Sequence, residues 1–145
     1  MQISSPEIEG TVPAKFTCDG EDVIPPLEIR DTPPGTKSFA IIFSDPDAVK
    51  VMGTVYYHWL VWNIPSSTLQ IEEGQIPGVQ GTHSGGKIDY HGPCPPEQHR
   101  YVFRLYALDT ELSLPEGSTH EQLEEAMRGH ILEQAEFTAT YERQQ

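Results

Sequence analysis

The chain has 145 residues, of which 37% are hydrophobic and 21% charged. This composition is typical of a globular protein, and the length suits one domain spanning residues 1–145. The formal net charge of −13 argues against binding to nucleic acid or to an anionic membrane surface, because both attract Lys and Arg.

No apolar run approaches the length of a membrane span, so we expect no stable membrane insertion. The acidic N-terminal segment lacks the basic and apolar regions of a secretory signal, which predicts a cytoplasmic protein. Cys18 and Cys94 have no zinc-type spacing. Two distant cysteines in a cytosolic protein are usually free thiols, although their spacing leaves a disulfide open.

The first forty residues predict short strands joined by turns. Alternating apolar residues around Ile3, Ile8 and Val12 indicate one or two edge strands. The segment Leu27-Glu28-Ile29 is typical of another short strand, and a Pro-Pro-Gly turn follows it.

The central segment predicts two strands around an acidic turn. Residues 39–44 are β-branched and aromatic, and a second strand runs from Tyr56 to Ile64 with His58 near its start. Between them lie Asp45-Pro46-Asp47 and a short polar loop. Taken alone, Asp-Pro favours a plain turn, and a histidine in a strand is usually structural. Carboxylates and a histidine at strand ends can also form a site.

The second half predicts a long loop, a strand, a helix and a final strand. Residues 66–92 are polar and rich in glycine, with a brief strand or turn near residues 76–79. The Pro-rich segment 92–96 leads into a strand over 99–109, with His99, Tyr101, Phe103 and Leu105 on one face. A capping box at Ser118 or Thr119 begins a helix that includes Leu123, Ala126, Met127 and Ile131, with Gly129 as its stop. Residues 132–141 then alternate as a strand.

Three segments together resemble one known family. They are Asp45-Pro46-Asp47-Ala48, His58-Trp59-Leu60-Val61-Trp62-Asn63, and Gly92-Pro93-Cys94-Pro95-Pro96 followed by His99-Arg100-Tyr101. In this order they are similar to motifs of the phosphatidylethanolamine-binding protein (PEBP) family, which includes Raf kinase inhibitor proteins. The resemblance spans residues 3–143 and looks like the compact prokaryotic branch.

The resemblance implies a mostly β fold, with a large antiparallel sheet packed on a smaller one and a peripheral C-terminal helix. It implies an anion pocket at one end of the large sheet, formed by Asp45, Asp47, His58, Pro95, His99 and Tyr101. The strands over 39–44, 58–64 and 100–108 should then be neighbours. Val49 stands where the family often has proline, which changes the pocket mouth. Because both cysteines lie in family motifs, we expect them near each other, either bridged or as thiols.

The residues themselves agree with a binding pocket. A phosphate-type anion needs donors, which protonated His58 and His99, Tyr101 and backbone N–H groups can supply. The carboxylates can orient and charge the histidines or take the ammonium of a head group. We therefore expect a non-enzymatic binding or regulatory protein without cofactor or metal. Its partners would be a phosphate-type anion or phospholipid head group, and a homodimer is allowed.

Two alternatives stay open at this stage. Some family members resemble enzyme inhibitors, so the partner can instead be a peptidase or another target enzyme. Asp45, Asp47, His58 and His99 can also be read as ligands of a metal-dependent hydrolase, but their spacing matches no metal signature. A serine triad has less support, since the nucleophile-elbow pattern is absent from the sequence.

Overall fold

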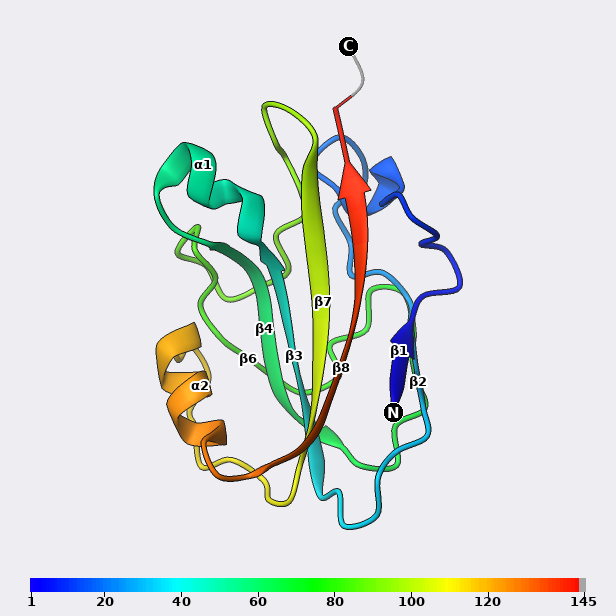
Figure 1. Cartoon of the computed structure of the whole chain (residues 1–145), viewed down its shortest axis with the longest axis vertical. Helices are drawn as coiled ribbons and strands as arrows, with labels where there is room; N and C mark the ends of the chain where they lie inside the picture. The colour runs from blue at the N-terminus through cyan, green and yellow to red at the C-terminus, as the bar shows by residue number, and fades with distance from the viewer. Residues whose placement is uncertain (144–145) are drawn as a thin grey trace.

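The computed structural model describes residues 1–143 as two packed β-sheets with short helices at the periphery (Figure 1). In chain order the elements are β1 (Gln2–Ser4), a 3₁₀ turn η1 (Ala14–Phe16), β2 (Leu27–Arg30), β3 (Ser38–Asp45), a 3₁₀ turn η2 (Pro46–Ala48), α1 (Val49–Met52), β4 (Tyr56–Pro65), β5 (Gln70–Ile71), β6 (Val79–Gln80), β7 (His99–Leu108), α2 (His120–Met127) and β8 (Ile131–Tyr141). Within this part of the chain, no helix has the length and apolar character needed to cross a membrane.

The two sheets confirm the predicted fold class. The larger sheet has the order β6-β4-β3-β7-β8 and the smaller has the order β1-β2-β5, and every pairing is antiparallel. The three strands predicted to be neighbours are therefore adjacent, with β4 and β7 on either side of β3. This order is what places their ends together.

Strand β3 lies at the centre of the molecule because both of its faces are apolar. Phe39, Ile41 and Phe43 point into the main core between the two sheets. Ala40 and Ile42 point the other way, into a second core that Leu60 and Trp62 share with helix α2. Since side chains alternate along a strand, an unbroken apolar run is buried on both sides. The rigid strand that carries Asp45 is thus fixed from two directions.

The C-terminal helix begins at the predicted capping box. The Thr119 hydroxyl accepts a hydrogen bond from the backbone N–H of Gln122, and the Gln122 side chain accepts one from the backbone N–H of Thr119. Leu123 and Met127 pack on the large sheet. The prediction was wrong at Ile131, which begins β8 instead of continuing the helix. Gly129 has a φ of 80°, and this left-handed turn ends the helical path before Ile131.

Two segments predicted as loops contain short elements. The loop after Asp45 folds into η2 and α1, and the helix ends at Gly53 with a φ of 78°. In the long loop, β6 pairs with β4 at residues 79–80, close to the predicted brief strand, whereas β5 was missed. Each of these two strands makes only two ladder pairs.

Candidate functional site

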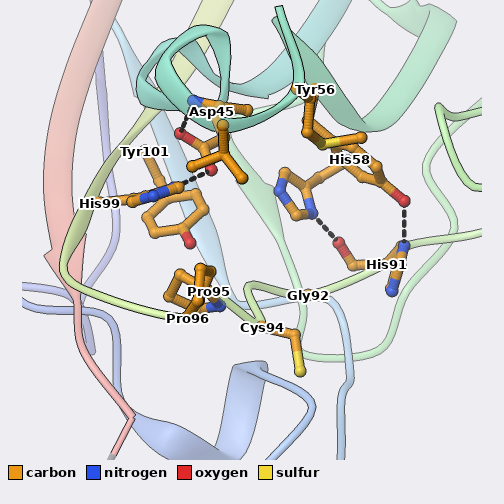
Figure 2. A pocket seen from close by; sticks show the side chains of 13 residues that line it. Asp45, Tyr56, His58, His91, Gly92, Cys94, Pro95, Pro96, His99 and Tyr101 are labelled. Carbon is orange, nitrogen blue, oxygen red and sulfur yellow. Dashed lines mark hydrogen bonds and ion pairs between the residues drawn. The ribbon is translucent and has the colours of Figure 1, made fainter.

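A cavity of about 190 Å³ opens at the end of the large sheet where β3 ends and β4 and β7 begin. Antiparallel neighbours run in opposite directions, so the last residue of β3 lies beside the first residues of β4 and β7. Five of the six predicted residues line this cavity, and they are Asp45, His58, Pro95, His99 and Tyr101 (Figure 2).

Asp45 joins the end of β3 to the start of the neighbouring strand β7. Its Oδ1 accepts a hydrogen bond from the backbone N–H of Ala48 at 3.1 Å, which caps the turn η2. Pro46 occupies the first position of that turn, where a missing N–H has no cost. The other oxygen, Oδ2, lies 2.6 Å from Nδ1 of His99. Asp and Pro therefore form the turn, and the same carboxylate also orients an imidazole.

Asp47, the sixth predicted residue, does not line the cavity. Its Oδ2 accepts hydrogen bonds from the backbone N–H and Nε of Arg100 at 2.8 and 3.2 Å, and its Oδ1 accepts one from Nη2 at 3.0 Å. The hydrogen bonds from the Arg100 side chain lower the pKa of Asp47 to about 2. Asp47 ties η2 to the start of β7, and a ligand-binding role for it stays a prediction without support from this placement.

His58 is buried, and its proton position follows from one contact. Nδ1 lies 2.5 Å from the backbone carbonyl oxygen of His91, which can only accept a hydrogen bond. Nδ1 therefore carries the proton, and Nε2 of the neutral ring is left with its lone pair. Burial lowers the pKa of His58 to about 3, because the imidazolium would lose its hydration. The expectation that His58 is a charged donor does not fit this environment.

His99 and Tyr101 lie two residues apart on β7 and face the cavity together, as predicted. Only 1% of the Tyr101 surface is exposed. Burial, followed by repulsion from Asp45 and Asp47, raises the pKa of Tyr101 above its ordinary value, so its hydroxyl stays a donor. The Nδ1–H of His99 donates a hydrogen bond to Asp45. When the ring is an imidazolium, its Nε2–H can donate a second hydrogen bond into the cavity. The two residues are the site's candidate donors.

The rim is a rigid segment fastened to the N-terminal part of the chain. A Cβ atom at Gly92 would lie 2.2 Å from Oδ1 of Asp22 and 2.4 Å from the backbone oxygen of Phe16, so only glycine fits there. The backbone N–H of Cys18 donates to the carbonyl of Pro93 at 3.1 Å. Cys18 and Cys94 form a disulfide, which confirms their expected proximity in its bridged form.

Four lining residues lie outside the motifs that the sequence pointed to, namely Tyr56, His91, Val51 and Met52. Tyr56 shares a strand face with His58, which the two-residue period could have shown. Its hydroxyl lies 2.9 Å from Nδ1 of His91. Val51 and Met52 belong to α1, which was predicted as a loop. Val49 begins that helix and does not line the cavity, so α1 contributes Val51 and Met52 to the lining instead.

The cavity contains little formal charge. Asp45 is the one acidic residue along its lining, where no Lys or Arg occurs. Over residues 1–143, no group of three or more His, Cys, Asp or Glu side chains is arranged to hold a metal ion. The lining combines imidazole, phenol and apolar side chains, which suits a small ligand with a few polar atoms.

Comparison with known proteins points to one family. Residues 2–142 match the family model described as phosphatidylethanolamine-binding protein. The chain is 44% identical over 142 residues to a UPF0098 protein of Methanothermobacter thermautotrophicus, covering 92% of each chain.

Two crystal structures are also similar to this chain. A phosphatidylethanolamine-binding protein homolog of Chlamydia trachomatis is 42% identical, with a TM-score of 0.94 and coverage of 99% of this chain and 97% of that one. YbcL of E. coli, described as a new member of the mammalian PEBP family, is 29% identical, with a TM-score of 0.90 and coverage of 99% and 98%.

Proposed function

Because the chain belongs to the phosphatidylethanolamine-binding protein family, we propose that it is a non-enzymatic binding protein whose cavity captures a small phosphate-type anion, free or as a phospholipid head group. The observation that carries the proposal is the convergence of His58, His99 and Tyr101 on one cavity closed by the rim 92–96. Family membership itself supports a small ligand-binding protein, and the proposal adds that the ligand is an anion.

The polar groups of the cavity support an anionic ligand. A buried phenol, and an imidazolium whose other N–H is held by a carboxylate, are donors that an oxyanion can use, and few water molecules compete in such a site. The remaining lining is apolar, so these few groups fix the orientation of the ligand. Serine, threonine and free cysteine are not among the residues that line the cavity, and we therefore propose binding without catalysis.

Calorimetric titration with inorganic phosphate, phosphoethanolamine and ethanolamine tests this function. Phosphate and phosphoethanolamine should bind, and Tyr101→Phe should weaken both by about tenfold, the effect of one hydrogen bond to a charged group. Tyr106→Phe is the matched control, because Tyr106 is a buried tyrosine on the opposite face of β7.

Two results would contradict the proposal. Absence of binding by both phosphate compounds would remove the anion, and preferential binding of ethanolamine would make the cavity a cation site centred on Asp45. Equal losses in Tyr101→Phe and Tyr106→Phe would show that the cavity phenol has no special role.

A further inference from the structure

We propose that His58 accepts a hydrogen bond from the ligand, so that the cavity selects phosphate-type anions that carry an acidic proton. It rejects sulfate esters and phosphodiesters, which carry none, and an intact phospholipid head group is a phosphodiester. Of the two sources that the proposed function allows, the cavity therefore takes free phosphate and phosphomonoesters. This inference rests on the proposed function and names the class of anion that the site takes. It makes His58 a specificity-determining residue.

The first step is the orientation of the His58 ring. Its Nδ1–H is held by the carbonyl of His91, and the backbone N–H of His91 donates to the carbonyl of His58 at 3.0 Å. Two main-chain contacts thus fix the ring from one side. Figure 2 shows the other nitrogen turned toward the interior of the cavity. The atom that the ligand meets is therefore a lone pair, and it needs a donor.

The second step is the set of groups that face His58. The rings of Tyr56, His91 and Tyr101 lie 4.7, 5.8 and 5.5 Å from it, measured between centroids. The ring of His91 in turn lies 5.1 Å from the ring of His83, measured between centroids. His83 accepts a hydrogen bond from Gly85 at Nδ1, and its Nε2 lies 2.7 Å from Asp89, so Nε2 carries its proton. Across the cavity lie His99 and Asp45.

None of these neighbours makes a charged His58 ring favourable. Phenols and imidazoles offer no negative charge, and the carboxylate of Asp45 is already bonded to His99 and to Ala48. Burial also lowers the pKa of His58 far below neutrality. His58 consequently enters the complex as a neutral acceptor.

The third step is the charge that the cavity can hold. Its lining has no Lys or Arg and one carboxylate, in a chain of net charge −13. A monoanion is favoured over a dianion in such a field. A phosphate monoester with one proton is a monoanion and also has the P–O–H donor that Nε2 requires. The second pKa of a phosphomonoester is about 6, so binding of the dianion at higher pH takes up one proton from solvent, which remains on the ligand oxygen facing Nε2.

Methyl phosphate and methyl sulfate form the test pair, because they have the same shape and, at pH 5, the same charge. They differ in one proton. By calorimetry at pH 5, we expect methyl phosphate to bind the wild type at least about tenfold more tightly, since methyl sulfate would set an oxygen lone pair against Nε2. At pH 8, titrations in buffers of different ionisation enthalpy should show uptake of about one proton per site with methyl phosphate.

The variant His58→Gln sharpens the test. A glutamine amide reaches the position of Nε2 and can turn its N–H toward the ligand, so the preference for methyl phosphate should fall toward unity. His130→Gln is the control, because His130 is an exposed histidine paired with Asp109 at the other end of β7 and should keep the full preference. If His58→Gln fails to fold, the preference and the proton uptake of the wild type decide alone.

The outcomes separate the two proposals. Equal affinity of the wild type for both esters, with the same pH dependence, would overturn the acceptor role and leave the anion site in place. Absence of binding by either ester between pH 5 and 8 would overturn the proposed function as well. A preserved preference in a folded His58→Gln variant would also count against His58.

Discussion

The cavity has two sides that are held in different ways. The strand wall consists of Asp45, His58, His99 and Tyr101, at the ends of β3, β4 and β7. The loop rim consists of residues 92–96, backed by residues 16–22 of the N-terminal part. Backbone ladders and two apolar cores fix the wall. The rim has no ladder and depends on a disulfide, a close glycine contact and single hydrogen bonds.

The site can therefore be disturbed in two different ways without losing the fold. Changes in the rim should lower stability and loosen the mouth while the sheet persists. Changes in the polar groups of the wall should alter ligand affinity with small effects on stability.

Removal of the Cys18–Cys94 bridge by Cys18→Ser and Cys94→Ser should lower the free energy of unfolding by about 4 kcal/mol, because a cross-link over 76 residues restricts the unfolded chain. Denaturant unfolding measures the change, and wild-type protein in reductant should match the variant. Far-ultraviolet circular dichroism should still show the β-sheets. Alkylation of two thiols in protein kept without reductant would show that the bridge is not formed.

That measurement also bears on the expected cytoplasmic location. Reducing compartments keep most cysteines as thiols. A stable bridge in protein isolated from its native cell would therefore argue for an oxidising environment or for a bridge protected by the rim.

Gly92→Ala should lower the free energy of unfolding by about 3 kcal/mol, because the new methyl group would overlap the Asp22 side chain and the backbone of Phe16 and Thr17. Thermal and denaturant unfolding measure it. Gly53→Ala is the control, since its Cβ meets open space and only the φ of 78° is strained, which costs about 1 kcal/mol. Equal losses of unfolding free energy in the two variants would mean that the rim shifts to accommodate a methyl group at position 92.

Asp47→Asn should cost about 1 kcal/mol of stability, a modest value because 63% of the Arg100 side chain is exposed to solvent. The pKa of Asp47 is lowered from 3.8 to about 2 by Arg100, so its contribution is present above pH 4 and is lost as the pH falls through 2. Melting temperatures from pH 6 to 2 should converge for wild type and variant at the acid end.

The control for Asp47 is Glu136→Gln, which removes an exposed pair with Arg104 on the same sheet and should change little. Affinity for phosphate should stay within about twofold in Asp47→Asn, since hydrogen bonds that do not touch the ligand contribute little to its binding. A larger loss of affinity would show that Asp47 contributes to ligand binding.

The sequence predicted the strand wall, the Pro-rich rim and the start of α2 better than it predicted α1. The strand period places His99 and Tyr101 on one face of β7, and the resemblance to the family motifs brings His58 to the same end of the sheet. Helix α1 was missed because four residues are too few to show a helical period, and two of them are β-branched valines. The two aspartates of the acidic turn look alike in the sequence, and only the position of Arg100 separates their roles.

Proton positions were the least predictable part of the site. His99 meets its carboxylate partner across 54 residues, and His58 meets its carbonyl partner across 33. Local patterns carry no information about such pairs. The motif alone indicates a charged donor at His58, whereas burial lowers the pKa of the ring and one distant main-chain oxygen fixes the proton on Nδ1.

The contact that holds His58 has a consequence for how this site changes over evolution. The oxygen that fixes its proton belongs to the main chain of His91, so side-chain replacement at position 91 leaves that oxygen in place. Proline is the exception, because it would remove the N–H that bonds the carbonyl of His58. A homologous protein with any residue other than proline at this position can thus keep the same tautomer of the His58 ring.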